Sequence, residues 1–371
     1  MTGSSLARER PAATFPVVPD PPKVLDRWVR FRVADPDHRF AGLTLECDPV
    51  VKGAGRSFSR RDGRWELRIP RPSLARLEYQ LGVVDHHGQA SSQLDPANPL
   101  RVDTAFGQKS VVELPGYQPP RWLTGPALEG RYEALAVRGE TTDALPITVW
   151  SPEGTTAREP LPLLLVQDRP EYDVLASLSR YSGSLIAAGT LPPHRLALLE
   201  PVQRNAWYSG SPQYLRTQMG AGLARLRQDY AVEGDVALLG ASLGGLTALL
   251  AGLHAPCGVG AVFSQSGSFF QVRHDDRHDS VATFPYYWRI AQRVQEILDM
   301  RRTERPLRIG LTCGALEENA PNNASMASAL ARAGHRVDHI ELPDLHNYTA
   351  WRDALDPHLT EVLRDCWHTT G

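Results

Sequence analysis

The sequence predicts an α/β protein in which a small β-sandwich precedes a doubly wound, mostly parallel β-sheet. Residues 24–115 consist of short alternating or β-branched runs separated by turns, with no convincing helical period. From residue 127, short continuous apolar runs alternate with longer amphipathic segments, the pattern of buried parallel strands joined by helices. Between these parts, residues 115–126 hold four prolines and two glycines, which is typical of an exposed interdomain linker.

In the first part, two turn dipeptides separate strand-like runs. Asp62-Gly63 and His87-Gly88 each place a glycine where a hairpin needs a positive φ. Trp28 and Trp65 fall inside alternating runs, so we expect both to be buried. The expected strands are 28–33, 43–47, 65–69, 77–84 and 111–114. Residues 1–23 are expected to be a flexible N-terminal segment.

The pattern of residues 127–371 predicts a doubly wound α/β domain whose ligands bind at the carboxyl ends of the strands. The expected strands are 145–150, 161–167, 195–200, 236–240, 260–264, 307–312 and 337–342. The expected helices are 212–230, 243–254, 287–300, 322–334 and 349–366.

Composition excludes several classes of partner. The 371 residues include 40 Lys and Arg and 42 Asp and Glu, so no basic surplus exists to bind nucleic acid or an anionic bilayer. The first twenty residues contain no apolar run of the length that a secretory segment needs, and no later run is long enough to span a membrane, which favours a cytoplasmic location. The four cysteines lie far apart and form no CxxC pair, so we expect them to be reduced and structural.

The motif GASLGG, residues 240–245, follows a predicted strand and opens a predicted helix. In this context GxSxG places the serine at the apex of a sharp turn as a nucleophile. The glycines flanking Ser242 are needed because a Cβ there would crowd the neighbouring strand or helix. Ser242 is therefore the predicted nucleophile.

A serine hydroxyl is a poor nucleophile unless a base takes its proton, and histidine is the usual base. The chain has twelve histidines. In α/β hydrolases the nucleophile, acid and base follow one another in that order, and the base lies after the last strand. Only His346 has this position, between the run VDHIELPD and the terminal helix. The other late histidines lie at or within that strand, or in or after that helix.

The acid should follow a late strand and orient the histidine. Glu317 and Glu318 come shortly after the run LRIGLTCG, and either of them can be the acid on this reasoning. Asp338 lies inside a strand, and Asp344 is too close to His346 in sequence, so both are weaker candidates.

The oxyanion hole needs two backbone N–H groups. Leu243, directly after the nucleophile, supplies one of them. The second should come from the loop after the strand LLLVQ, where Pro170 has no N–H and Arg169 is the expected donor.

Residues 240–270, GASLGGLTALLAGLHAPCGVGAVFSQSGSFF, resemble the nucleophile region of the enterochelin (enterobactin) esterase family among the esterase D-like α/β hydrolases. GALEENAPNNASMASAL and LPDLHNYTAWRDAL resemble that family's acid and histidine segments, which places Glu317 and His346 on the matching positions. The β-rich part that ends in LDPANP is similar to the family's immunoglobulin-like domain. The resemblance thus implies an α/β-hydrolase fold at 127–371, an immunoglobulin-like β-sandwich at 24–115 and a linker at 116–126.

The resemblance also reaches the residues expected to bind substrate. Asp168 and the Arg204 region match the family, and Trp207 and Phe269 offer rings that could stack against an aromatic acyl group, although aromatic residues at helix starts are often core. The chain departs from the family at Asp168-Arg169-Pro170, where an Asp-Gly pair is usual, and near Trp207, where a glutamate is absent. The resemblance therefore implies the three catalytic residues more strongly than it implies which substrate they act on.

Together these features predict a serine esterase that forms an acyl-enzyme on a small-molecule ester and needs no cofactor. Family members hydrolyse siderophore lactones, and relatives act on feruloyl or acetyl sugar esters. An acyltransferase and a catalytically idle binding module stay open as alternatives, and so does the oligomeric state. The string RHDDRHD, residues 273–279, is expected to be a solvated loop, because its spacing matches no metal-ligand pattern.

Overall fold

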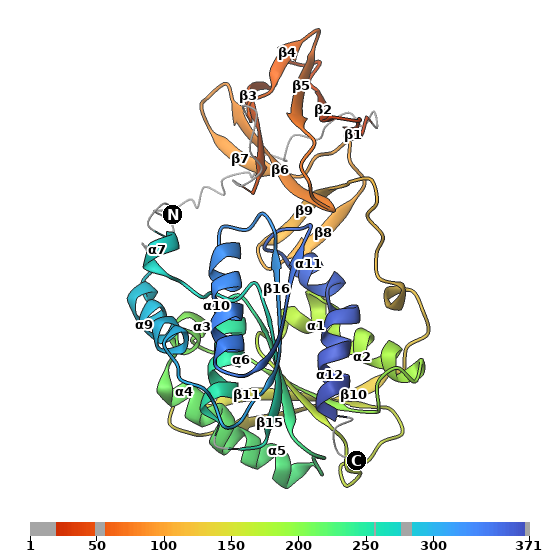
Figure 1. The fold of residues 1–371 in the computed structure, drawn as a ribbon. Coiled ribbons are helices and arrows are strands. Elements are labelled where there is room, and N and C mark those ends of the chain that lie inside the picture. Colours follow the sequence, from red (N-terminus) through yellow and green to blue (C-terminus); the bar gives the residue numbers. More distant parts are fainter. Residues whose placement is uncertain (1–19, 49–55, 256, 276–283, 368–371) are drawn as a thin grey trace, which may run out of the picture. The chain divides into compact units, whose positions relative to one another are not determined.

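The computed structural model describes residues 20–48, 56–255, 257–275 and 284–367 of the 371-residue chain. The chain divides into two compact units, Met1–Tyr117 and Gln118–Gly371 (Figure 1).

The first unit is built from antiparallel strands. They form two sheets, one in the order β1-β2-β5-β4 and the other in the order β3-β6-β9-β8, with β7 paired to β6. The strands are β1 (Lys23–Val24), β2 (Trp28–Ala34), β3 (Phe40–Cys47), β4 (Ser59–Arg61), β5 (Arg64–Pro70), β6 (Arg76–Asp85), β7 (Ala90–Gln93), β8 (Arg101–Thr104) and β9 (Gly107–Glu113).

The two sheets of this unit share one core. In β2, Phe31 is fully buried, and its ring meets that of Tyr79 from β6 edge to face at 5.1 Å. This packing confirms the expected small β domain. The alternation of strand side chains also buries Trp65, but Trp28 is 43% exposed because it begins β2 on the outward-facing side, so the expectation of burial is wrong there. Gly63, in the first predicted hairpin, has a φ of 70° as the turn requires.

The second unit contains an eight-stranded sheet in the order β10-β11-β13-β12-β14-β15-β16-β17. The first three strands in this order pair antiparallel, and from β13 onward the sheet is parallel. The strands are β10 (Gly130–Val137), β11 (Leu145–Pro152), β12 (Leu163–Val166), β13 (Arg195–Leu199), β14 (Val236–Ala241), β15 (Val259–Gln265), β16 (Arg308–Gly314) and β17 (Arg336–Leu342). Seven of them were predicted, and β10 was not.

Helices cover both faces of this sheet (Figure 1). One apolar layer receives side chains from α3 (Arg204–Tyr208), α4 (Pro212–Arg216), α5 (Leu223–Asp229), α6 (Leu243–His254), α9 (Tyr287–Leu298) and α10 (Ala320–Arg332). The other receives them from α1 (Glu171–Leu175), α2 (Leu178–Ala187), α11 (Tyr348–Asp353) and α12 (Thr360–Trp367). The short α7 (Val272–Asp275) follows β15. A parallel sheet covered on both faces is the doubly wound architecture that the sequence predicted.

Two predicted segments differ from their expected form. The helix expected at 349–366 is broken between α11 and α12, where Asp356 has non-helical dihedral angles. In the predicted exposed linker, the indole of Trp122 is buried and packs edge to face on Tyr181 at 5.5 Å. The guanidinium of Arg180 donates to the carbonyl of Leu123. The second half of that segment is therefore packed on the helical layer of the second unit.

Candidate active site

Ser242 lies between β14 and α6, at the carboxyl end of the parallel strands. Its φ of 55° and ψ of −123° are a strained conformation for a residue with a side chain. A Cβ on Gly240 would stand 2.1 Å from the carbonyl oxygen of Gly244, and a Cβ on Gly244 would stand 2.8 Å from the carboxylate of Asp168. The close approach of β14 to α6 therefore requires Gly240, and the close approach of α6 to Asp168 requires Gly244, as the motif predicts.

Four neighbouring strands, β14 to β17, bring the predicted residues to the same edge of the sheet. Ser242 follows β14, Glu317 follows β16 and His346 follows β17. The carboxylate Oε2 of Glu317 accepts a hydrogen bond from Nδ1 of His346 at 2.8 Å. Glu317 is buried, whereas the His346 side chain is 38% exposed. The other ring nitrogen of His346, Nε2, forms no hydrogen bond with the residues that the structure describes.

Burial tends to raise the pKa of Glu317, but its hydrogen bonds reverse the direction. The bond from His346 and that histidine's charge favour the carboxylate, and so do the hydroxyl of Ser266 and the N–H of Gly314, so the pKa of Glu317 lies below its usual range. A carboxylate held ionised beside Nδ1 stabilises a protonated imidazole.

The side chains of Glu318 and Asp344, the carboxylates close to Glu317 and His346 in sequence, differ from Glu317 in their environment. Glu318 is exposed to solvent. The side chain of Asp344 accepts from the N–H of Leu345 at 2.8 Å and from the amide of Asn347 at 3.1 Å, so it ties together its own loop. Of the two acids left open by the sequence, Glu317 is the one that contacts His346.

The hydroxyl of Ser242 is hydrogen-bonded to the hydroxyl of Ser268 at 3.3 Å. Within the described part of the chain, no hydrogen bond joins Ser242 to His346. The N–H of Ser268 also donates to the carbonyl of Ser242 at 3.0 Å. The structure therefore shows the nucleophile candidate in a rotamer that contacts the loop after β15.

The backbone N–H groups near Ser242 differ in availability. Leu243, the first residue of α6, has no acceptor for its N–H among the described residues. The N–H of Arg169, in contrast, donates to the carbonyl of Leu199 at 3.0 Å and is not available to a substrate, contrary to expectation. That of Asp168 donates to the Tyr208 hydroxyl. Glu171, the first residue of α1 directly after this loop, has an N–H without an acceptor among the residues described.

Asp168 and Arg204 form a two-point ion pair beside the turn at Ser242. The two oxygens of the buried carboxylate accept from Nε and Nη2 of Arg204 at 2.6 and 2.8 Å. Burial acts to lower the pKa of Arg204, but the hydrogen bonds that its guanidinium donates to Asp168, and the charge of that carboxylate, outweigh burial and raise the pKa. Asp168 is therefore engaged by Arg204, while Nη1 of Arg204 has no acceptor in the described structure.

Two predicted substrate-binding rings are core residues instead. The side chain of Phe269 is fully buried and belongs to the same apolar layer as the buried side chains of α6 and α9. Trp207 is also buried and stacks on Tyr214 at a centroid distance of 5.0 Å. The expectation that they stack on a substrate is not supported, because packing within the unit already covers both rings.

Sequence reasoning missed the residues that support the acid and base. Ser266, directly after β15, donates to Oε1 of Glu317 at 2.7 Å, and Nε1 of Trp351 donates to Ser266 at 2.9 Å. The Trp351 ring packs edge to face on His346 at 5.0 Å. The serine-rich run SQSGS after a predicted strand was the one signal that could have found Ser266 and Ser268.

The string RHDDRHD is described only up to Asp275, and residues 276–279 lie outside the described part. The carboxylate of Asp275 is buried and accepts from the N–H of Gln271, the amide of Asn322 and the hydroxyl of Tyr287. In the ranges that the structure covers, no group of three His, Cys, Asp or Glu side chains could hold a metal ion.

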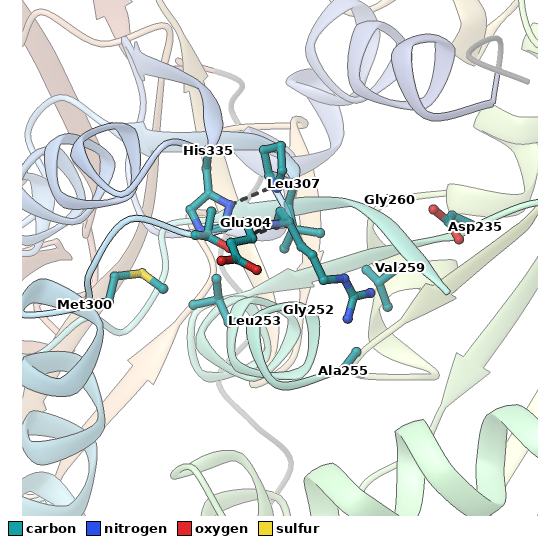
Figure 2. Close-up of a pocket in the computed structure, with 13 residues that line it drawn as sticks. Asp235, Gly252, Leu253, Ala255, Val259, Gly260, Met300, Glu304, Leu307 and His335 are labelled. Atoms are coloured by element: carbon teal, nitrogen blue, oxygen red, sulfur yellow. Dashed lines mark hydrogen bonds between the residues drawn. The ribbon is translucent and has the colours of Figure 1, made fainter. Parts of the chain in front are cut away.

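A cavity of about 400 Å³ lies at the other edge of the sheet (Figure 2). It is lined by the end of α6 near Leu253, by Val259 at the start of β15 and by Leu307, whose N–H donates to Nδ1 of His335. Because these are the amino ends of the parallel strands, this cavity is separate from the site around Ser242.

The doubly wound sheet and the tight strand–serine–helix turn at the carboxyl ends of its strands define an α/β hydrolase. No helix in the described part of the chain is long and apolar enough to cross a membrane.

Comparison with known protein families shows to which family of α/β hydrolases the chain belongs. The Esterase family model matches residues 140–362, which is more than half of the chain. The chain therefore belongs to this esterase family. Among curated proteins, an Iron(III) enterobactin esterase of Dickeya dadantii (strain 3937) is 27% identical over 285 residues. The match covers 70% of this chain and 63% of that protein, less than two thirds of its length.

Solved structures show the same fold. The enterochelin esterase from Shigella flexneri superposes with a TM-score of 0.72 at 18% identity, over 94% of this chain and 96% of that chain. Ferric enterobactin esterase from Salmonella typhimurium gives a TM-score of 0.72 at 18% identity, over 91% and 93%. A ferulic acid esterase covers 64% of this chain and 99% of its own, with a TM-score of 0.54 at 16% identity. The chain is thus similar in fold to enterochelin esterases along both units.

Proposed function

We propose that this esterase is a serine hydrolase that works through an acyl-enzyme intermediate, with Ser242, His346 and Glu317 as nucleophile, base and acid. The observation that carries the proposal is the bond from His346 Nδ1 to the buried carboxylate of Glu317, on the same sheet edge as the strained turn at Ser242. This is the chemistry that activates a serine hydroxyl.

The proposed reaction begins when the Ser242 side chain turns from Ser268 to His346. Nε2 of His346 takes the hydroxyl proton while Oγ attacks the ester carbonyl carbon, and Glu317 stabilises the imidazolium that forms. The negative oxygen is held by the N–H of Leu243 and, in place of Arg169, by that of Glu171. His346 then returns the proton to the leaving alcohol, and a water molecule activated by His346 cleaves the acyl-enzyme. No cofactor takes part in this scheme.

For the substrate, we propose a siderophore ester of the enterochelin type. The support is the 27% identity to an Iron(III) enterobactin esterase and the fold similarity to enterochelin esterases along both units. Arg204 supports an anionic substrate, since its side chain is 39% exposed and Nη1 has no acceptor in the described structure. Asp168 then acts by orienting Arg204.

A cytoplasmic location remains part of the proposal, as do the domain boundaries 24–115, 116–126 and 127–371.

The alternative is a feruloyl or acetyl sugar esterase, or an acyltransferase, with the same triad. The fold similarity to a ferulic acid esterase over the second unit favours the first of these. Turnover measured in parallel on catecholate triester lactones, feruloyl esters and short acyl esters distinguishes the substrates. Product analysis with added acceptor alcohols distinguishes hydrolysis from acyl transfer.

The mechanism is tested by Ser242→Ala, with Ser328→Ala as the matched control on the exposed side of α10. We expect Ser242→Ala to lower kcat on p-nitrophenyl esters by about 10⁴- to 10⁶-fold with an unchanged circular dichroism spectrum, and Ser328→Ala to behave like the wild type. A fluorophosphonate should label Ser242 covalently. Equal turnover by Ser242→Ala and the wild type would show that the serine mechanism is wrong.

A further inference from the structure

Ser266 connects Glu317 and Trp351 through its side chain. It is the first residue after β15, and it is buried. Its hydroxyl donates to Oε1 of Glu317 at 2.7 Å and accepts from Nε1 of Trp351 at 2.9 Å. Because Trp351 supplies the hydrogen bond that the hydroxyl oxygen accepts, the proton of Ser266 is directed at Glu317.

The carboxylate of Glu317 is held in one orientation by these contacts. Oε1 accepts from the Ser266 hydroxyl and from the N–H of Gly314, both at 2.7 Å. Oε2 is thereby left to face Nδ1 of His346. Two donors on one oxygen thus decide which oxygen meets the base, since a carboxylate with free rotation would exchange the two.

The backbone at Ser266 is strained in a way that supports a role for its side chain. Its φ of 47° lies in the left-handed region, where glycine is favoured over serine. Two hydrogen bonds hold the backbone of Ser266 in this conformation. Its N–H donates to the carbonyl of Thr312, and the side-chain amide of the preceding residue, Gln265, donates to the carbonyl of Trp351 at 2.9 Å. A serine at this position keeps a hydroxyl that glycine would lack.

We propose that Ser266 is a positioning residue for this esterase, oriented by Trp351, which fixes Glu317 so that Oε2 meets His346. The inference rests on the proposed function, because it assigns Ser266 a role through the proposed acid. Trp351 contributes a second contact, the edge of its ring against the imidazole of His346.

The first test compares Ser266→Ala with Ser266→Gly. Both remove the hydroxyl, and the glycine variant also relieves the positive φ, so it guards against a loss that comes only from folding. We expect kcat on p-nitrophenyl esters to fall about 10- to 100-fold in both variants while KM changes less than about twofold, because the lost bond is to a charged group away from the substrate. Trp351→Phe keeps the Ser266–Glu317 bond and should lower kcat by a smaller factor.

The second test is a double-mutant cycle with Glu317→Gln. If Ser266 acts through Glu317, Ser266→Gly should change kcat less than about threefold in the Glu317→Gln background. Equal fold losses in both backgrounds, or wild-type kcat in both Ser266 variants, would overturn the inference. Because the Ser242→Ala result is independent of these variants, loss of activity there together with wild-type Ser266 variants would refute this inference alone.

Discussion

The carboxylate of Asp168 and the guanidinium of Arg204 meet in a two-point ion pair, 36 residues apart in sequence. The Asp168 side chain is 3% exposed and that of Arg204 is 39% exposed. The carboxylate therefore depends on this one cation, while the cation keeps contact with solvent.

Replacing Arg204 with Met should destabilise the protein, since it leaves the Asp168 carboxylate buried without its counter-charge. We expect the free energy of unfolding to fall by about 1–3 kcal/mol, less than for a fully buried pair because Arg204 is partly solvated. Urea denaturation measures this change. The double variant Asp168→Asn/Arg204→Met should regain part of the loss, and a double variant less stable than Arg204→Met would contradict the proposed dependence.

Glu317→Gln should lower kcat by about 10³- to 10⁴-fold, because an amide cannot balance the imidazolium charge and has only one oxygen for three donors. The matched control is Glu318→Gln, whose side chain is exposed; it should retain turnover within about twofold. Steady-state kinetics on p-nitrophenyl esters distinguishes them. A larger loss in Glu318→Gln would mean that the wrong carboxylate has been assigned.

Gly240→Ala should destabilise the turn at Ser242 severely. The new Cβ would stand 2.1 Å from the carbonyl oxygen of Gly244, a backbone atom that cannot move without shifting α6. We expect a loss of more than about 4 kcal/mol in the free energy of unfolding, together with loss of activity.

The control for this substitution is Gly220→Ala, where a Cβ meets open space. It should change the free energy of unfolding by no more than about 1 kcal/mol, in the stabilising direction, because Gly220 lies in the helical turn Thr217–Gly222 and alanine favours a helical backbone over glycine. Thermal unfolding of the two variants gives the comparison, and a fully stable Gly240→Ala protein would refute the close packing at this turn.

His194 should make the stability fall in mild acid. Burial lowers the pKa of this fully buried imidazole from 6.5 to about 4, against the opposing bond to the Pro192 carbonyl. Below pH 6.5 the unfolded chain binds a proton at His194 that the folded chain does not bind until about pH 4. The stability that is complete above pH 6.5 is therefore lost progressively as the pH falls to about 4, by about 2–4 kcal/mol from this residue.

His194→Asn tests this pH dependence, since asparagine can still donate to the Pro192 carbonyl but does not titrate. The free energy of unfolding, measured by urea denaturation from pH 4 to 7, should have a flatter slope in the variant than in the wild type. Parallel slopes would show that His194 titrates alike in the folded and unfolded chains.

Local sequence patterns were sufficient for most of the fold. Seven strands of the large sheet and the helix 243–254 were predicted, because a parallel strand buried on both faces is a continuous apolar run and α6 begins directly after Ser242 of the GASLGG motif. β10 was missed because its exposed edge position leaves it without such a run. Trp122 and Trp28 were misplaced because burial depends on what packs against a segment, which a proline-rich or alternating pattern does not contain.

Local patterns in the chain were enough to predict that Ser242 lies at a tight turn, that His346 follows the last strand, and that a carboxylate at 317 or 318 lies between them in chain order. Tertiary structure alone decided which carboxylate contacts His346, that the Arg169 N–H is taken by Leu199, and that Trp207 and Phe269 are core. It also brought Ser266 and Trp351 to Glu317. The physical reason is that strand and turn patterns are local, whereas hydrogen-bond partners and burial depend on groups from distant segments meeting at the edge of the sheet.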